Sequence, residues 1–349
     1  MLEIADTLPE RIADVEALDE LLSRPSLGVI EAIRGMEGPL MILGVGGKMG
    51  PTLARMAVRA AQAAGSAIEV LGVSRFSETG LRERLEAWGV RTIACDLLDE
   101  AALAALPDAP NIVYMAGHKF GASTNQPLTW AMNTFLPGLV ARRFAGARLV
   151  AFSSGNVYPL VPVASGGATE ETTPNPVGEY AMSVLGRERI LAYWAGRLHS
   201  PTLLLRLNYA AELRYGVLLD VAQKVWRGEP VDVTMGHANV IWQGDANAAA
   251  LQALALADVP PVPLNLTGPE TCAVRGLAEE FGRLLDREPQ IVGGEQPTAL
   301  LSNARRAHEA FGYPRVPLGR AIGWVADWVR AGGPTLDKPT KFQVRDGTF

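Results

Sequence analysis

The sequence predicts an α/β protein in which a doubly wound parallel sheet is followed by a smaller C-terminal domain. Three observations support this. Short apolar runs alternate with longer segments of helical periodicity between residues 39 and 208, a glycine-rich turn follows the first apolar run, and proline and glycine become frequent after Asn208. Strict alternation of buried strands and crossover helices is typical of a parallel sheet with helices on both faces.

Six apolar runs have the length and the polar or glycine boundaries of buried parallel strands. They are Leu40–Leu43, Ile68–Val73, Arg91–Ala94, Ile112–Met115, Leu149–Phe152 and Thr202–Leu207. The segments between them have the periodicity of amphipathic helices. These are Thr52–Ala64, Leu81–Trp88, Glu100–Leu106, Leu128–Phe144 and Tyr180–Arg197.

The chain of 349 residues is long enough for two packed domains. Residues 1–38 are predicted to be a helical extension, 39–208 a dinucleotide-binding domain, 209–330 a mixed α/β substrate domain with some crossing of the chain, and 331–349 a C-terminal tail. The tail is either a strap or partly disordered. Ligands of such sheets lie beyond the carboxyl ends of the strands, so we expect the second domain to close over a substrate there.

A glycine-rich loop joins the first predicted strand to the first crossover helix. Its glycines have the spacing G-x-x-G-x-x-G. Such a loop lets the backbone approach a pyrophosphate closely, and the N–H groups at the start of the next helix point at that anion. The sequence therefore predicts a dinucleotide site formed by Gly44, Gly47, Lys48, Met49 and Gly50.

The end of the second strand bears on the choice of cofactor. In NAD sites an acidic residue usually follows this strand, but here Ser74 and Arg75 do. A small hydroxyl followed by a guanidinium suits the 2′-phosphate of NADP, which arginine can bind with two hydrogen bonds. The alternative is an arginine that is merely solvated, so NADP is the expected cofactor and NAD the alternative.

Further motifs extend this pattern along the chain. Asp96 and Leu97 follow the third strand, Y-M-A-G-H-K-F-G begins at Tyr114, and F-S-S-G-N-V-Y begins at Phe152. With the glycine loop, they resemble an extended short-chain dehydrogenase/reductase of the NAD-dependent epimerase/dehydratase family, with a Rossmann fold, over residues 39–330. The resemblance implies cofactor contacts from Asp96, Leu97, Ala116, Gly117 and Lys119.

The resemblance also implies a catalytic pair. Ser154 corresponds to the family's serine or threonine, which hydrogen-bonds the reacting oxygen, and Tyr180 corresponds to its catalytic tyrosine. Ser183 and Glu188 stand at the family's spacing from Tyr180. Taken alone, Ser154 would be read as a residue that satisfies a local backbone group, and Tyr180 as a core aromatic.

One position departs from the family pattern. Val184 stands where the family's Y-x-x-x-K motif has a lysine that stabilises tyrosinate. Without a cation, a tyrosine with a pKa of ~10 is only ~0.1% ionised at neutral pH. Four alternatives follow. Lys119 or His118 approaches Tyr180 in place of the missing lysine, or the oxidised cofactor supplies the positive charge. Otherwise neutral Tyr180 donates a proton in carbonyl reduction, or the redox activity is lost.

Composition excludes several other classes of function. The net charge of −5 does not predict a nucleic-acid surface. Cys95 and Cys272 belong to no Cys-x-x-Cys motif, and the four histidines show no metal-ligand spacing, so we expect neither a disulfide framework nor a metal site. With no secretory signal and no long apolar run, a cytoplasmic protein without membrane contact is the expectation.

The sequence thus predicts an NAD(P)-dependent oxidoreductase, epimerase or dehydratase acting by hydride transfer on a sugar, sugar nucleotide or related hydroxy compound. The alternative is a dinucleotide-binding regulatory or interaction protein that has lost redox activity. A homodimer is expected, because the family pairs two helices of each subunit in a four-helix bundle. The apolar residues available for it are Met132, Phe135, Leu139, Val140, Leu185, Ile190 and Trp194.

Overall fold

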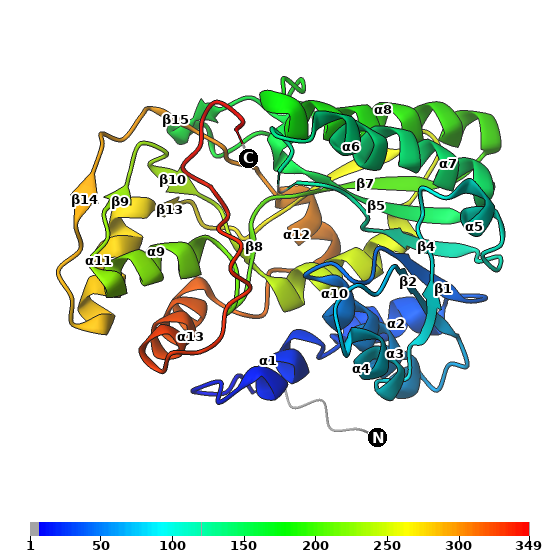
Figure 1. Ribbon diagram of the computed structural model, residues 1–349, viewed down its shortest axis with the longest axis horizontal. Helices are drawn as coiled ribbons and strands as arrows, with labels where there is room; N and C mark the ends of the chain where they lie inside the picture. The colour runs from blue at the N-terminus through cyan, green and yellow to red at the C-terminus, as the bar shows by residue number, and fades with distance from the viewer. Residues whose placement is uncertain (1–6, 120, 349) are drawn as a thin grey trace.

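The structure is a computed structural model that describes residues 7–119 and 121–348. The first residues of the predicted N-terminal extension, Phe120 and the last residue of the tail lie outside the described part. Within that part, a seven-stranded parallel sheet has the order β12-β7-β5-β4-β1-β2-β3 (Figure 1). Helices cover both of its faces, so the predicted doubly wound α/β fold is confirmed.

The six predicted strands are all present, with ends that differ by no more than two residues. The strand order reverses between β1 and β4, which is the switch point at which such folds bind ligands. The strands are β1 (Leu40–Leu43), β2 (Val70–Ser74), β3 (Arg91–Ala94), β4 (Asn111–Tyr114), β5 (Arg148–Ser154) and β7 (Thr202–Leu207).

A seventh strand was not predicted. β12 (Val262–Leu266) pairs in parallel with β7 at the edge of the sheet, although more than fifty residues separate the two strands in the sequence. Pro263 lies within it, and proline is tolerated in edge strands because one side of such a strand needs no ladder donor. The chain therefore returns to the sheet after it has entered the second domain.

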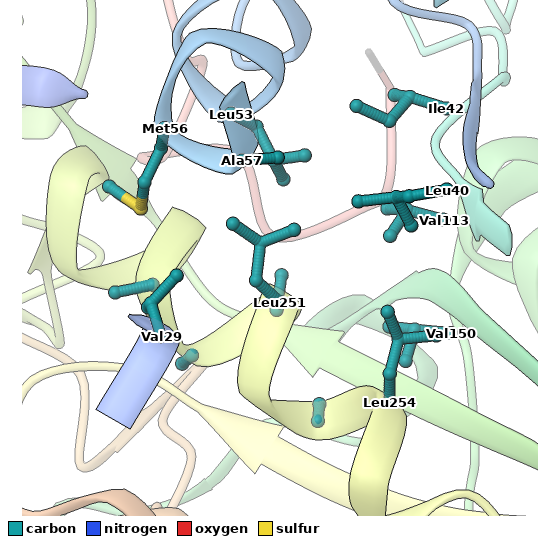
Figure 2. Close-up of a cluster of buried hydrophobic side chains, with 14 of the residues drawn as sticks. Val29, Leu40, Ile42, Leu53, Met56, Ala57, Val113, Val150, Leu251 and Leu254 are labelled. Carbon is teal, nitrogen blue, oxygen red and sulfur yellow. The ribbon is translucent and has the colours of Figure 1, made fainter. Parts of the chain in front are cut away.

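Alternate side chains of the strands enter two separate cores. Leu40 and Ile42 of β1 pack with α2 (Leu27–Arg34), α3 (Gly50–Ala64) and α10 (Gln243–Gln252) on one face (Figure 2). Met41 and Leu43 pack on the other face, with α7 (Leu136–Arg143) and α8 (Gly178–Leu198). This alternation is the two-residue period of a strand buried on both sides.

The C-terminal half builds a third core beside the sheet. It consists of α9 (Val217–Arg227), α11 (Val274–Leu285) and α13 (Leu318–Arg330). The N-terminal extension contributes to both parts of the molecule, because α1 (Val15–Leu22) packs in this third core while α2 packs against α3. The extension is therefore integral to the fold.

The remaining elements are short. They comprise α4 (Leu81–Ala87), α5 (Glu100–Ala104), α6 (Gln126–Trp130), α12 (Arg305–Phe311), the π-helix η1 (Ala131–Phe135), the 3₁₀ helices η2 (Gly155–Val157), η3 (Val163–Ser165) and η4 (Ala253–Leu256), and the strands β6 (Val161–Pro162), β8 (Ala210–Ala211), β9 (Val231–Asp232), β10 (His237–Ala238), β11 (Ile241–Trp242), β13 (Cys272–Ala273), β14 (Ile291–Val292) and β15 (Thr298–Ala299).

The predicted helix Leu128–Phe144 is interrupted. It consists of α6, one turn of π-helix η1 and α7. A π-turn inserts one residue into the helix and is common near functional sites. Here it contains Asn133, whose side chain is fully buried and directed at the loop after β4.

The C-terminal segment 331–348 crosses the front of the molecule between the two domains (red in Figure 1). Its backbone is fixed at several points. Thr340 donates to Asp220 from its backbone N–H (2.8 Å) and its hydroxyl, Phe342 is buried, and Arg345 donates to Thr298. Of the two alternatives predicted for the tail, the described residues form a strap.

Candidate functional site

A cavity of about 380 Å³ lies at the carboxyl ends of β1, β4, β5 and β7. It is lined by loops at the ends of these strands, by Tyr180 and Arg187 of α8, and by the segment that follows β7. Eight of the predicted site residues line it: Gly44, Gly47, Lys48, Met49, Gly117, Lys119, Ser154 and Tyr180. The other predicted residues, Gly50, Ser74, Arg75, Asp96, Leu97 and Ala116, lie outside its lining.

The glycine loop has the shape that a dinucleotide site requires. Gly44 has φ +91°, and a Cβ there would lie 2.7 Å from the backbone nitrogen of Ala116. At Gly50 a Cβ would lie 2.2 Å from the carbonyl oxygen of Val45, so only glycine lets α3 start this close to the loop that follows β1. Gly47 is exposed toward the cavity, where backbone can approach a bound phosphate. These residues fit a pyrophosphate at the start of α3.

The residues after β2 and β3 are those that the sequence predicts to contact the adenosine part of a dinucleotide. Ser74 is close to the loop, since a Cβ on Gly46 would lie 2.5 Å from the Ser74 hydroxyl, and Arg75 is exposed. Asp96 is exposed and accepts a hydrogen bond from the Leu98 N–H (3.1 Å). Leu97 is buried in the core, so its side chain packs inward, away from the cavity lining.

Two lysines converge on the cavity from different loops. The Nζ of Lys48 lies 3.0 Å from the ring centroid of Tyr215, and the Nζ of Lys119 lies 5.6 Å from the ring centroid of Tyr180. Burial lowers the pKa of Lys48 to about 6, with further lowering by Lys119 and Lys338. Burial also lowers the pKa of Lys119 to about 8. Both amines are thus held in a confined region where each would gain from a bound anion.

Ser154 and Tyr180 meet in the cavity. Ser154 ends β5, and its hydroxyl oxygen accepts hydrogen bonds from the backbone N–H (3.2 Å) and side-chain amide (2.9 Å) of Asn156. Because both donors occupy the oxygen's lone pairs, the single Ser154 proton remains for the phenol of Tyr180 or a substrate oxygen. The two side chains are hydrogen-bonded to each other.

The environment of Tyr180 keeps its phenol protonated. Burial raises the pKa of Tyr180 above its ordinary value of 10.0, while the positive charge of Arg187 and the hydrogen bond from Ser154 oppose that rise. The phenol is therefore neutral at physiological pH. Of the alternatives that follow from the missing lysine, this favours proton donation by neutral Tyr180.

Val184 is buried one turn after Tyr180. It is 1% exposed and packs with Val157, Met235 and Leu301 in an apolar cluster. The family's lysine position is thus filled by hydrocarbon.

Arg187 brings a cation to the same wall, one turn further along α8. Its guanidinium is 5% exposed, lines the cavity, and donates to the carbonyl oxygen of Phe152 (2.5 Å) and to the carbonyl (3.3 Å) and side-chain oxygen (3.0 Å) of Asn133. The π-turn of η1 presents both Asn133 oxygens to it. Arg187 is a further cation beside Tyr180, and its charge opposes the rise in the pKa of that phenol.

His118 is held by the side chain of Asn133, which accepts a 2.8 Å hydrogen bond from the His118 backbone N–H. The His118 ring contacts the Thr129 hydroxyl at 3.0 Å.

A buried polar network supports the end of β5. Glu188 accepts from Ser153 and from two nitrogens of Arg206, at 3.0 and 2.7 Å. Arg206 also donates to the Tyr158 hydroxyl (2.7 Å), which donates to Asn265 on β12 (2.8 Å). Both charges are paired and hydrogen-bonded, as buried ions must be. The network fixes the strand that carries Ser154.

Several polar cavity residues were not singled out as site residues from the sequence, among them Asn133, Asn156, Arg187 and Lys338. Arg187 had a detectable signal, because residues 180, 184 and 187 recur on one face of a helix. Asn133 depends on the π-turn and Lys338 on the path of the C-terminal strap, neither of which has a signature in the local sequence.

The described part of the chain has neither a metal-binding cluster nor a helix that could span a membrane. Residues 7–119 and 121–348 contain no group of three or more His, Cys, Asp or Glu side chains placed to hold a metal ion. In the same part of the chain, every helix is too short or too polar to cross a membrane.

The model of the NAD dependent epimerase/dehydratase family matches residues 40–231, which are more than half of the chain. The chain belongs to this family. The matched region contains the glycine loop, Ser154 and Tyr180, and it ends in β9. No curated protein matches the chain.

Solved structures share the fold at low sequence identity. MoeE5 in complex with UDP-glucose and NAD is 18% identical, with a TM-score of 0.67 over 84% of this chain and 99% of that one. The Thermus thermophilus UDP-glucose 4-epimerase complex with NAD is 19% identical, with a TM-score of 0.69 and the same coverage. The Bacillus cereus UDP-glucuronic acid 4-epimerase complex with NAD is 16% identical, also at 0.69 over 84% and 99%.

Proposed function

We propose that the chain is an NAD(P)-dependent enzyme that interconverts a hydroxyl and a carbonyl group on a sugar-like compound. The observation that carries this proposal is that Ser154 and Tyr180 share one cavity with the glycine loop at the switch point of the sheet. The family match and the NAD that several structural neighbours bind support it. The cytoplasmic location stays a prediction.

A nicotinamide dinucleotide bound at the glycine loop would supply hydride transfer. Gly44, Gly47, Lys48 and Met49 would hold it, together with Gly117 and Lys119 after β4. Ser154, oriented by Asn156, donates a hydrogen bond to the substrate oxygen. Tyr180 supplies its proton to that oxygen in the reductive direction and takes it back in the oxidative direction.

Arg187 is the residue that we propose to adjust this proton transfer. Its guanidinium is fixed by hydrogen bonds to Phe152 and Asn133, so its charge stays close to the phenol. A nearby positive charge stabilises tyrosinate and lowers the free energy needed to remove the proton. Arg187 thus takes over in part the electrostatic role of the lysine that Val184 replaces.

The role of Arg187 is tested by the pH dependence of alcohol oxidation, which requires tyrosinate. Arg187→Gln should raise the pKa of Tyr180 and reduce the oxidation rate at pH 8 about tenfold for each unit of pKa shift. Arg187→Lys should keep most of the rate, and circular dichroism should show that both variants are folded. An unchanged pH profile in folded Arg187→Gln would assign the cation a purely structural role.

For the cofactor we propose NADP, on the basis of Arg75. Its side chain is exposed directly after β2, and the preceding residue, Ser74, lies close to the glycine loop. The 2′-phosphate of NADP is the group that this position suits. The neighbours named above were solved with NAD, which is the alternative.

The proposed function is tested in two steps. Fluorescence titration with NADH and NADPH should show saturable binding, which Gly47→Glu abolishes through a negative charge at the phosphate position. Absorbance at 340 nm should then report turnover with members of a panel of sugars, polyols, hydroxy acids and sugar nucleotides. Binding without turnover on the whole panel would favour the alternative, a dinucleotide-binding regulatory protein. Val184 at the lysine position is compatible with that alternative, because the family's lysine stabilises tyrosinate, which only the chemistry requires.

We further propose that two chains associate through α7 and α8. Large apolar side chains are exposed on this side of the molecule, notably Phe135 (55%) before α7 and Tyr193 (52%) on α8. Leu139 and Val140 are buried within the subunit, so they contribute to its core. The surface proposed for a partner therefore consists of Phe135, which the sequence predicted, together with Met182 and Tyr193, which it did not.

A further inference from the structure

The first turn of α3 directly follows the glycine loop, and its N-terminal end is open. Met49, the residue at the N-cap, makes no side-chain hydrogen bond to the helix, and Pro51 in the first turn has no N–H. The backbone N–H groups that remain at such a helix start are those that meet a bound phosphate. Their direction depends on how the first turn of α3 is held.

Thr52 in this turn is the centre of a buried polar network. Its hydroxyl donates to the carbonyl oxygen of Met49 (3.2 Å) and accepts hydrogen bonds from the side-chain amides of Gln243 (3.3 Å) and Asn247 (3.0 Å). The side chains of Thr52, Gln243 and Asn247 are buried, each in a residue no more than 2% exposed. A hydroxyl has one proton and two lone pairs, so these three contacts use all of its hydrogen-bonding capacity.

The two amides reach Thr52 from a distant part of the chain. Gln243 and Asn247 are 191 and 195 residues after it, on the first two turns of α10. β11, which leads into α10, pairs with β8, and the N–H of Ile241 donates to the carbonyl oxygen of Tyr209 (3.2 Å). α10 then packs against α3 in the core that Figure 2 shows. The segment that follows β7 is therefore tied through α10 to the glycine loop.

Gln243 differs from the other members of the network in its position. It lines the cavity, whereas Thr52 and Asn247 are not among the described lining residues. An effect of Gln243 on ligand binding could therefore come from a direct contact or from the hydrogen bond to Thr52. An effect of the Thr52 hydroxyl could come only through the orientation of the loop and of α3.

We propose that Thr52 and Gln243 are positioning residues for the dinucleotide, because their hydrogen bond fixes the first turn of α3 against α10. This inference rests on the proposed function and adds to it two residues that act behind the glycine loop. Hydrogen bonds weaken steeply when their geometry is poor. A first turn that is free to shift would therefore present its N–H groups less favourably to the diphosphate.

The test is a double-mutant cycle in which NADH and NADPH binding is measured by fluorescence titration. Thr52→Val keeps the shape of the side chain but removes the hydroxyl, and Gln243→Met keeps the length but removes the amide. Each should weaken the tighter-binding dinucleotide at least fivefold. The double variant should bind no more than twofold worse than Thr52→Val, because that substitution already removes the partner of Gln243. Thr52→Ser, which keeps the hydroxyl, should bind within twofold of the wild type.

Thr202→Val is the matched control for the loss of a buried hydroxyl. Thr202 is 1% exposed, lies at the start of β7, and donates to the carbonyl oxygen of Ser200 (3.0 Å). The cavity lies at the carboxyl ends of the strands, so this residue is at the other end of the sheet. Its dinucleotide affinity should stay within twofold of the wild type, even if its melting temperature falls as far as that of Thr52→Val.

Several results would overturn the inference. Thr52→Val or Gln243→Met could leave dinucleotide affinity within twofold, and Gln243→Met tests this even if Thr52→Val does not fold. The two losses could multiply in the double variant, which would assign to Gln243 a direct contact independent of Thr52. Thr202→Val could weaken binding as much as Thr52→Val, which would assign the loss to stability. A wild type that binds neither NADH nor NADPH would contradict the proposed function as well, so the two failures are distinguishable.

Discussion

Val184 shows how one side chain changes the chemistry available to its neighbour. A lysine at this position would have to enter an apolar cluster with Val157 and Met235. Overfilling a packed core costs about 1–3 kcal/mol, and the buried ammonium adds a desolvation cost. The apolar residue therefore favours stability and leaves Tyr180 in its protonated form.

Val184→Lys tests this description of the site. We expect the free energy of unfolding in urea to fall by about 1–3 kcal/mol or more. Val184→Ile is the control for added volume without charge, and its loss should be smaller. A folded lysine variant of unchanged stability, in which the pH profile of oxidation shifts toward neutrality, would show that the niche can hold a cation.

Tyr180 is predicted to be the only phenol that acts at the substrate oxygen. Tyr180→Phe should reduce turnover at least a hundredfold while NADH binding is retained, because general acid catalysis typically contributes factors of about 10²–10⁴. Tyr209→Phe, in the same cavity, is the matched control. Intact activity in Tyr180→Phe would reassign the proton transfer to Lys119 or His118.

Arg75 decides between the two cofactors. If its guanidinium holds the 2′-phosphate, Arg75→Ala should weaken NADPH binding by about 1.5–3 kcal/mol and leave NADH binding almost unchanged. Arg91→Ala, an exposed arginine at the start of β3, should affect neither cofactor. Equal losses for both cofactors, or tighter binding of NADH by the wild type, would contradict the assignment.

At the scale of elements, strands were predictable where the apolar pattern is local. The six runs from Leu40 to Leu207 are short, continuous and bounded by turn residues, so each strand could be recognised by itself. β12 could not, because Pro263 interrupts its pattern and its pairing with β7 joins distant parts of the chain. The π-turn at Asn133 also lacks a local pattern, so the contact with Arg187 could not be predicted.

The attachment of α8 to the sheet depends on the buried pair of Glu188 and Arg206. Arg206→Ala should lower the free energy of unfolding by about 3–5 kcal/mol, because it leaves a buried carboxylate without its partner. Arg189→Ala, at the exposed position next to Glu188 on α8, should change the free energy of unfolding by no more than about 0.5 kcal/mol. Recovery of stability in the double variant Glu188→Gln, Arg206→Met would support the unpaired carboxylate as the cause of the loss. A small loss of stability in Arg206→Ala would contradict it.

At the scale of the whole molecule, the sequence predicted the sheet, the glycine loop and the Ser154–Tyr180 pair. It allowed a strap as one of two alternatives for the tail but could not predict its path, because Lys338 is placed at the cavity by contacts of its neighbours with Asp220 and Arg214, which are distant in sequence. Local patterns thus identified the predicted chemistry of the site, while Lys338 joins its lining through the packing of the chain's end.

The assembly state is a second prediction at this scale. Small-angle scattering at micromolar concentration should give twice the 37.2 kDa of the chain. Phe135→Glu with Tyr193→Glu should give the monomer, because the charges would lie on the exposed apolar side of α7 and α8. Arg283→Glu, on α11, should leave the dimer intact. A wild type that scatters as a monomer would contradict the prediction.

The decisive measurement is the pH dependence of single-turnover reduction by the protein loaded with NADPH or NADH, using the carbonyl compound that the 340 nm screen identifies. Burial raises the pKa of Tyr180 above 10.0, so the acid stays protonated through neutrality. The rate should be flat from about pH 6 to about pH 9 and should fall only at higher pH. A rate that falls between about pH 6 and 8, or one that Tyr180→Phe does not reduce, would show that another group donates the proton.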